Sequence, residues 1–198
     1  MASVIYGSYD GGFDDEFVVF DIETTGLDKI CEEITEIGAV LVENGQVTKR
    51  WGTFVNPEKP IPAKISELTS ITDDMVADAP KISEALPEFF EFAKGAVLVA
   101  HNAKFDTGFI KEKAKKCGIE YSFGHLDTLM LAKCLYPDLA NYRLNTLTKH
   151  LNVVLENHHR AVDDAKATAD IFVKMLEELK LLGKQDITLL NDPFDMRA

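Results

Sequence analysis

The stretch FVVFDIETTGL, Phe17–Leu27, places two acids inside an otherwise apolar run. Its β-branched and aromatic residues predict a buried strand. Because side chains alternate across a strand, Asp21 and Glu23 point to the same face, with Cα atoms about 6.6 to 7 Å apart. Two unpaired carboxylates are costly in a sheet covered by helices, so a cation is the expected partner. The alternative is that the strand ends at Phe20 and both acids are solvated.

Hydrophobic patterns along the chain predict the remaining elements. The Asn-Gly pair in ENGQ predicts a type I′ hairpin between the second and third strands. The expected strands are 17–22, 34–42, 47–55, 96–100 and a short one near His125. The expected helices are 65–68, one from Thr72, 82–94, one from Ala103 closed by Gly118, one capped by Asp127, 144–151 and 161–182. Strands followed by strands interleaved with helices predict an α/β fold, a mixed sheet with helices on both faces.

Length and charge limit the organisation and the partners of the chain. With 198 residues, 46% of them hydrophobic, the sequence predicts one domain at 17–182. Residues 1–16 are expected to be a linker or an excised domain boundary, and 183–198 a C-terminal tail. The 33 acids and 21 bases give a net charge of −12, which argues against a broad basic face that grips duplex DNA. Any nucleic acid must therefore be held locally.

The cysteines and the N-terminus indicate a cytoplasmic protein. Cys31, Cys117 and Cys134 form no CxxC pair, so neither a zinc knuckle nor a disulfide framework is expected. The first residues lack a basic and apolar leader, and no apolar run approaches the roughly 18 residues of a membrane helix. We expect a soluble protein of a reducing cytosol, without a membrane partner.

Two further segments carry acids close to the start of a helix. Asp106 follows the strand AVLVA and falls in the first turn of the next helix, where it could also serve only to complement the helix dipole. In HHRAVDDAKATADIF, the helical phase places Asp164 at the edge of the apolar stripe and Asp163 nearly opposite it, facing water. His159 lies five residues before Asp164, where a loop can bring it to the same place.

Four carboxylates and one histidine from separate segments indicate a metal-dependent chemistry. Oxygen ligands without thiolates suit Mg²⁺ or Mn²⁺. Two such ions, about 3.5 to 4 Å apart, can clamp a phosphodiester, activate a water and stabilise the leaving oxygen. A histidine titrates near neutral pH and can take the proton of the water.

The segments FDIETTGL, AHNAKFD and HRAVDDA resemble, in order and spacing, the three motifs of the DEDDh (DnaQ-like) 3′→5′ exonucleases over about Phe17 to Lys180. The resemblance implies a ribonuclease H-like fold with a five-stranded mixed sheet and two Mg²⁺ or Mn²⁺ ions. It implies His159 as general base and the following metal ligands: Asp21, Glu23, Asp106 and Asp164. These five residues form the expected catalytic set.

Other segments, among them TFVNPEKPIP and ELTSITDDMV, look like the proofreading exonuclease of PolC-type bacterial DNA polymerase III. This likeness implies a single-stranded or frayed DNA 3′ end as substrate and the remainder of a replicative DNA polymerase as partner. Ser70 departs from the pattern, since the family often has glycine there. Two alternatives remain: a DEDDh exoribonuclease, and a non-catalytic module that binds a 3′ end or braces a polymerase.

The resemblance also implies residues that contact the terminal nucleotide: Thr24, Thr25, Gly26 and Leu27, with Leu27 and Phe105 against its base. Phe105 could equally be a core residue. His101 could help shape the site, although a structural histidine beside a helix start is the favoured interpretation, and Glu36 has no assigned role. The charge run Lys111–Lys116 could contact the DNA backbone, although such runs are usually solvated helix faces.

The tail KQDITLLNDPF loosely matches the glutamine-plus-hydrophobic pattern of peptides that bind the sliding clamp. The matching residues are Gln185, Ile187, Leu189 and Leu190. Short motifs of this kind are degenerate, and the same leucines could continue a helix that packs on the parent polymerase.

Overall fold

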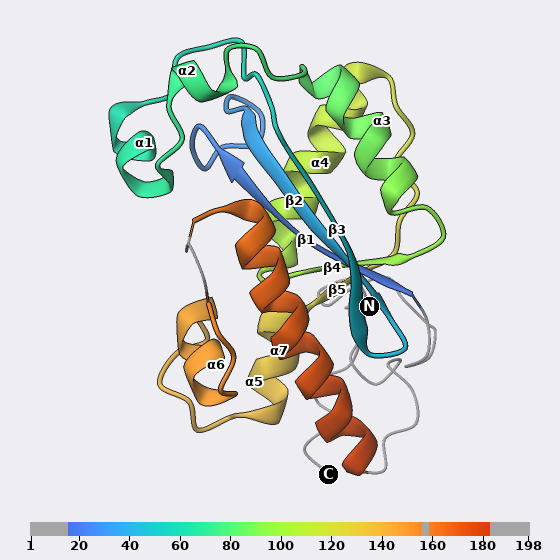
Figure 1. The fold of residues 1–198 in the computed structure, drawn as a ribbon. Helices are drawn as coiled ribbons and strands as arrows, with labels where there is room; N and C mark the ends of the chain where they lie inside the picture. The colour runs from blue at the N-terminus through green and yellow to red at the C-terminus, as the bar shows by residue number, and fades with distance from the viewer. Residues whose placement is uncertain (1–15, 156–158, 183–198) are drawn as a thin grey trace, which may run out of the picture.

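The computed structural model describes residues 16–155 and 159–182. Within them lies one five-stranded sheet of order β3-β2-β1-β4-β5 (Figure 1). The strands are β1 (Phe17–Thr24), β2 (Ile34–Glu43), β3 (Gln46–Phe54), β4 (Val97–Ala100) and β5 (His125–Asp127). The first three are antiparallel neighbours, whereas β4 runs parallel to β1 and β5 parallel to β4. The predicted mixed sheet is therefore confirmed.

Helices cover both faces of this sheet, as predicted (Figure 1). They are α1 (Ala63–Thr69), α2 (Asp73–Val76), α3 (Ile82–Phe92), α4 (Ala103–Cys117), α5 (Thr128–Leu135), α6 (Leu144–His150) and α7 (Ala161–Leu181). The α7 helix and the shorter α5 and α6 pack on one face, and α3 and α4 pack on the other. The expectations for residues 1–15 and 183–198 lie outside the described residues.

Alternation along β1 sends its side chains into two different cores. Phe17 and Val19 pack with α7, whereas Val18 and Phe20 pack with α3 and α4. Because β1 continues to Thr24, Asp21 and Glu23 extend the row of Phe17 and Val19 on the α7 face. The alternative that the strand ends at Phe20 is wrong.

Two paired glycines let the first turn of α7 approach the sheet. Gly38 on β2 pairs with Asp21 on one side and with Gly52 on the other. A Cβ atom on Gly38 would lie 2.2 Å from the backbone nitrogen of Val162, and one on Gly52 would lie 2.3 Å from the Val162 Cγ2 atom. No larger residue fits under the helix at these positions, so the glycines bring the start of α7 beside the acids of β1.

Several local signals in the sequence are confirmed. Gly118 closes α4 in the left-handed conformation with φ of 68°, and the Asp127 carboxylate accepts a 2.9 Å hydrogen bond from Leu129 N–H at the start of α5. Ser70 at the end of α1 has φ of 60°, a conformation that glycine adopts with less strain. No helix in the described part of the chain is long and apolar enough to span a membrane.

Candidate active site at the end of strand β1

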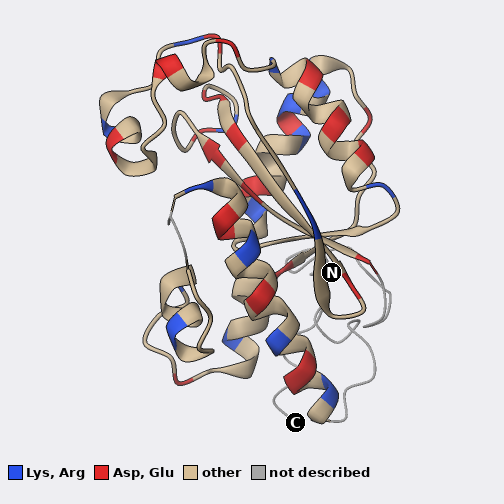
Figure 2. Ribbon diagram, in the orientation of Figure 1, with Lys and Arg blue, Asp and Glu red and all other residues tan. Residues whose placement is uncertain are grey.

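Acidic residues lie on the ribbon where β1 ends beside the first turn of α7 (Figure 2). One ligand atom from each of Glu23, His159 and Asp164 lies within 4.8 Å of the other two. Asp164 is buried, with 4% of its surface exposed, and the other two are half-buried. The cluster thus combines a residue of β1, a residue two positions before α7 and a residue in the first turn of α7.

The two remaining predicted acids interact electrostatically with this cluster. Burial is the largest cause that raises the pKa of Asp21 well above its ordinary value, followed by the charges of Asp106, Glu23 and Asp164. Asp106 is also buried, in the first turn of α4. Each acid that the sequence selected therefore lies close enough to affect the ionisation of another.

The pKa shifts show that this arrangement is costly without a cation. Burial, followed by the charges of Asp164 and Glu36, raises the pKa of Glu23 to about 8. Burial also raises the pKa of Asp106, although hydrogen bonds from its own backbone and that of Ile22 oppose the rise. Bound divalent cations would neutralise these carboxylates and displace their protons. The donor set of carboxylate oxygens and one imidazole fits Mg²⁺ or Mn²⁺.

The backbone ahead of α7 fixes His159 next to Asp164. His159 has a positive φ of 70°, and its N–H donates a 2.9 Å hydrogen bond to Asp164 Oδ2. The helical phase predicts the burial of Asp164 correctly. Asp163 is half-buried, although the sequence placed it facing water, and its charge interacts with Arg160 at the start of α7.

Glu36, to which the sequence gave no role, holds the start of α7. Its buried carboxylate forms an ion pair with Arg160, with Nη2 to Oε1 at 2.9 Å, and accepts a 3.1 Å hydrogen bond from Ala161 N–H. The Arg160 guanidinium lies 5.1 Å from the centroid of the Phe54 ring. In the sequence, the only sign of this role is a lone acid within the apolar strand pattern ITEIGAV. Its partner, Arg160, lies 124 residues later in the chain.

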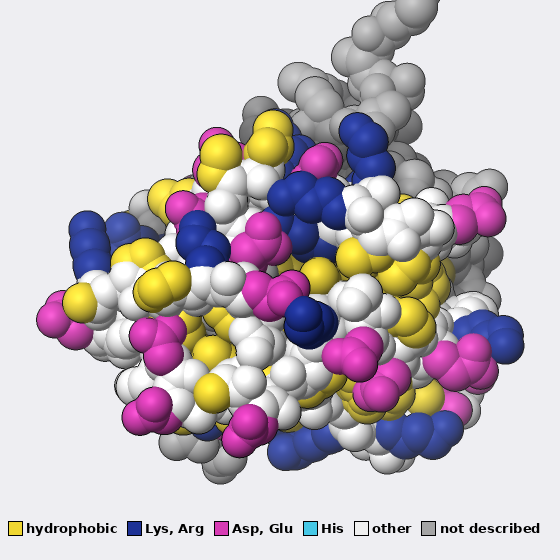
Figure 3. Space-filling model, turned by 90° about the horizontal axis from the view of Figure 1, so that it is seen from above, with side chains coloured by type: hydrophobic (Ala, Val, Ile, Leu, Met, Phe, Trp, Pro, Cys, Tyr) yellow, Lys and Arg dark blue, Asp and Glu magenta, His cyan; other side chains and the backbone are white. Residues whose placement is uncertain are grey.

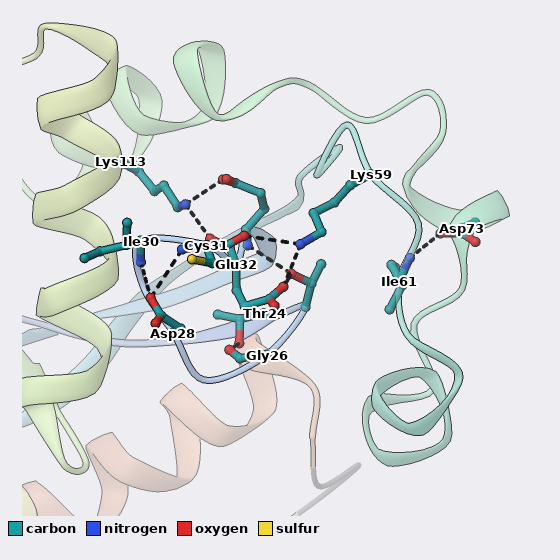
Figure 4. A network of polar contacts seen from close by, with 12 residues as sticks. Thr24, Gly26, Asp28, Ile30, Cys31, Glu32, Lys59, Ile61, Asp73 and Lys113 are labelled. Atoms are coloured by element: carbon teal, nitrogen blue, oxygen red, sulfur yellow. Dashed lines mark hydrogen bonds and ion pairs between the residues drawn. The ribbon is translucent and has the colours of Figure 1, made fainter.

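The loop between β1 and β2 has an internal polar network beside the site (Figure 4). The Thr25 hydroxyl donates to Glu32 Oε2 at 2.5 Å and accepts from Glu33 N–H at 3.0 Å. Thr24 Oγ1 donates to Gly26 O at 2.6 Å. Both threonines are buried, and Thr25 N–H also donates to Glu33 O at 2.8 Å, so internal bonds fix this segment of the loop.

Three lysines fix the same loop by binding three consecutive carbonyl groups. Lys116 Nζ donates to Ile30 O at 2.8 Å, Lys59 Nζ donates to Cys31 O at 3.2 Å, and Lys113 Nζ donates to Glu32 O. Lys113 is fully buried and pairs with Glu33 at 2.7 Å. Burial is the main cause that lowers the Lys113 pKa, and Glu33 opposes this effect. Two lysines of the run Lys111–Lys116 therefore position a loop, a role that neither interpretation of the run included.

This loop borders a hollow of about 470 Å³ that adjoins α4. Leu27 and Phe105, the predicted base contacts, both line it, together with Ile30 and Phe109. Leu27 is 86% exposed, whereas Phe105 is half-buried with its ring 5.0 Å from that of Phe109. Phe105 packs on the core and also lines the hollow, so its contact with a terminal base stays a prediction. Exposed apolar residues in a fixed loop are suited to stack against a planar ligand.

His101 is engaged at both ring nitrogens. Nε2 donates to Tyr142 O at 2.8 Å, and Nδ1 lies 3.0 Å from Thr128 Oγ1. Burial is the largest cause that lowers the His101 pKa, which favours the neutral ring. This geometry agrees with the structural role expected from the sequence.

A mixed five-stranded sheet with acids at the end of its central strand defines a ribonuclease H-like nuclease. The family model described as exonuclease (RNase_T) matches residues 18–172. The chain belongs to this exonuclease family, and the resemblance drawn from the three motifs is confirmed at this level.

Relatives are similar over almost the whole chain. The PolC-type DNA polymerase III of Caldanaerobacter subterraneus subsp. tengcongensis is 54% identical over 188 residues, which are 95% of this chain and 13% of that protein. The PolC-type polymerase III of Clostridium perfringens is 49% identical over 195 residues, which are 96% of this chain and 13% of that protein. The chain thus spans about an eighth of the length of these curated relatives.

Solved structures show the same fold. Exonuclease X, solved in complex with 5′ overhanging duplex DNA, is 27% identical with a TM-score of 0.71, and the match covers 88% of this chain and 99% of that one. The nuclease domain of 3′hExo, a DEDDh family member bound to rAMP, has a TM-score of 0.73 at 19% identity and covers 84% of this chain and 94% of that one. At that identity, the second likeness concerns the fold alone.

Proposed function

We propose that the chain is a 3′→5′ exonuclease that removes nucleoside monophosphates from a single-stranded or frayed DNA 3′ end. Its setting would be proofreading within a cytoplasmic PolC-type replicative polymerase. The observation that carries the proposal is the cluster of Glu23, His159 and Asp164, beside Asp21 and Asp106, in a chain of the exonuclease family.

The four carboxylates would hold two Mg²⁺ or Mn²⁺ ions. The ligands would be Asp21, Glu23, Asp106 and Asp164. When bound, such ions supply the charge that activates a water and stabilises a leaving oxygen. The chain itself contributes a fixed set of oxygens, because Asp164 is bonded to the backbone of His159 and the start of α7 is bonded to Glu36.

His159 would act as the general base that removes the proton from the attacking water. Its ring lies within the 4.8 Å cluster, and its backbone is held by Asp164. A base near the carboxylates that would hold the metal is placed to receive this proton as the oxygen attacks phosphorus. The P–O bond to the penultimate nucleotide would then break, with release of a 5′-monophosphate.

The hollow beside the β1–β2 loop would receive the terminal base. Leu27 and Phe105 would contact the base faces, while Thr24, Thr25 and Gly26 would contact the rest of the terminal nucleotide. The lysines that bind three loop carbonyls keep Leu27 in position before substrate arrives. Such preorganisation reduces the entropy cost of binding.

DNA is the proposed substrate because the relatives at 42 to 54% identity are named DNA polymerases. Discrimination between DNA and RNA depends on contacts to the 2′-hydroxyl, which the acids do not provide.

Matched 5′-labelled DNA and RNA strands, incubated with Mn²⁺ and then quenched with EDTA, test the proposal. We expect faster release of mononucleotides from DNA and a full stop in EDTA. Faster loss of RNA would favour an exoribonuclease, and cleavage of neither strand would favour a binding module.

Attachment to a polymerase would compensate for weak binding by the free domain. The net charge is −12, and positive and negative side chains are interspersed on the face seen from above (Figure 3). Few phosphates can be neutralised by such a surface, so counterion release is small. Tethering raises the effective concentration of a frayed 3′ end. The proposed clamp peptide around Gln185 and Leu189 lies outside the described residues.

A further inference from the structure

A second hollow, of about 760 Å³, lies between the end of β4 and the loop that joins α5 to α6. Its lining includes His101, Asn102, Lys133, Asn141, Arg143 and Asn145. In Figure 1, the α5–α6 segment and the α1–α2 segment lie on opposite sides of the first turn of α7.

The second hollow adjoins the hollow assigned to the terminal base at one shared residue. Asn102 lines both of them. Its backbone is held in the left-handed conformation, with φ of 67°, and its N–H donates to Asp127 Oδ1 at 3.0 Å. A strand with its 3′ end in the first hollow can pass over this fixed residue into the second.

Internal hydrogen bonds hold the loop that forms the second hollow. His101 donates to Tyr142 O, and the Tyr142 hydroxyl donates to Tyr136 O at 2.9 Å. Asn141 Oδ1 accepts hydrogen bonds from Arg143 N–H at 3.2 Å and from Thr146 Oγ1 at 2.7 Å. The side-chain cations are thus presented from a preformed surface, which favours binding.

The charge of the second hollow is positive and uncompensated. Lys133 and Arg143 are both exposed, no acid lines the hollow, and neither cation forms an ion pair within residues 16–155 and 159–182. A comparable basic hollow lies between β3 and α7, but it includes Asp170 and Glu177. That hollow shares no lining residue with the terminal-base hollow. The second hollow therefore has two cations and no acid in its lining, and it shares Asn102 with the terminal-base hollow.

We propose that the second hollow binds the backbone phosphates of the nucleotides upstream of the 3′-terminal one, with Arg143 and Lys133 as phosphate ligands. Arginine can bind a phosphate in a bidentate manner, and lysine acts as a point charge. Asn141 and Asn145 add amide groups that suit sugar and phosphate oxygens. The inference rests on the proposed function, because it follows the strand outward from the terminal nucleotide.

The test uses two substrates, one that carries upstream phosphates and one that has none. The double variant Lys133→Ala/Arg143→Ala is assayed on a thymidine hexanucleotide and on the nitrophenyl ester of thymidine 5′-monophosphate. We expect kcat/KM for the hexanucleotide to fall about tenfold, while that for the ester stays unchanged. The slope of log affinity against log salt should become shallower by about 0.7 for each lost phosphate contact on a single strand. The variant Arg50→Ala/Lys174→Ala removes the same charge from the hollow between β3 and α7 and should behave as wild type.

Binding of the labelled hexanucleotide in Ca²⁺, measured by fluorescence anisotropy, separates this inference from the proposed function. If the wild type binds but hydrolyses neither substrate, the proposed function fails, and the affinity of the Lys133→Ala/Arg143→Ala variant still decides the inference. Unchanged hexanucleotide binding in that variant would overturn it. Equal losses on hexanucleotide and ester, or equal losses in the control variant, would overturn it as well.

Discussion

Glu23 on β1 and Glu36 on β2 lie directly opposite each other, and Arg160 pairs with Glu36. Residues opposite each other on neighbouring strands share a face, so both carboxylates point toward the start of α7. Glu36 also accepts the N–H of Ala161, whereas Glu23 lies in the cluster with His159 and Asp164. One acid of the pair therefore positions the helix, and the other is available for chemistry.

Replacement of Glu36 by Gln should misplace the start of α7. The amide keeps the size of the side chain but loses the charged bond to Arg160, and hydrogen bonds to charged groups contribute about 1.5 to 3 kcal/mol. We expect the free energy of unfolding to fall by about 1 to 2 kcal/mol. This value is below the full range because Arg160 is partly exposed, and solvent weakens its ion pair. We also expect kcat to fall more than KM rises. Urea unfolding and steady-state kinetics measure both, with Glu43→Gln at the far end of β2 as control. Wild-type values of both quantities would refute the positioning role.

Gly38→Ala should displace α7 from the sheet. The added Cβ would lie 2.2 Å from backbone atoms of Ala161 and Val162, which cannot yield as a side chain can. Overpacking of this kind costs about 1 to 3 kcal/mol, which thermal unfolding would detect. Gly108→Ala in α4 is the matched control, since its Cβ would meet only the flexible Lys29 side chain at 3.3 Å. That control should be neutral or stabilising, by up to about 1 kcal/mol. Similar losses in both variants would contradict the close-approach argument.

His159→Ala should lower kcat with little change in affinity for the terminal nucleotide. General-base assistance contributes about 10² to 10⁴-fold to a rate, and we expect a loss in that range. Steady-state kinetics on single-stranded DNA in Mn²⁺ measure it. The neighbouring His158→Ala, outside the described residues, should have a much smaller effect. A larger loss for His158 than for His159 would show that the register of the third motif is misassigned.

The free energy of unfolding of the metal-free protein should decrease as pH rises, and Glu23→Gln should make this decrease smaller. The pKa of Glu23 rises from 4.5 to about 8 on folding, so the folded state binds more protons between these values. The free energy of unfolding then decreases from about pH 4.5 to about pH 8. In EDTA, the variant should exceed the wild type by about 2 to 5 kcal/mol at pH 8 and by little at pH 4.5. Urea unfolding at both pH values tests this, and a gap independent of pH would contradict it.

The sequence predicts the strands, the main helices and the burial of Asp164 because each depends on a local period. Phe17 to Ile22 alternate in a strand, and Ala161 to Leu179 repeat at helical spacing. The four candidate acids and the histidine were identified by their places at the ends of such elements and by family motifs. Their proximity in the structure follows from the parallel pairing of β1 with β4 and from the packing of α7 on β1.

The supporting residues could not be predicted in the same way. The role of Glu36 depends on the cross-strand register and on an arginine 124 residues later in the chain. Lys113 sits in a run that looks solvated, and only the fold places it under the β1–β2 loop. Gly38 resembles any other strand glycine until the start of α7 lies over it. Tertiary contacts, rather than local propensity, decide each case.

The most direct test of the account is the time course of a 5′-labelled single strand in Mn²⁺ with wild type, Asp163→Asn and Asp164→Asn. A 3′→5′ exonuclease with Asp164 in the cluster predicts a ladder of labelled products that shorten one nucleotide at a time. We expect the ladder to form at a similar rate in Asp163→Asn. In Asp164→Asn, the rate of cleavage should fall more than about 100-fold, beyond the loss typical of a residue that only supports a ligand. Early release of the labelled 5′ nucleotide, internal cuts, or undiminished activity of Asp164→Asn would contradict the account.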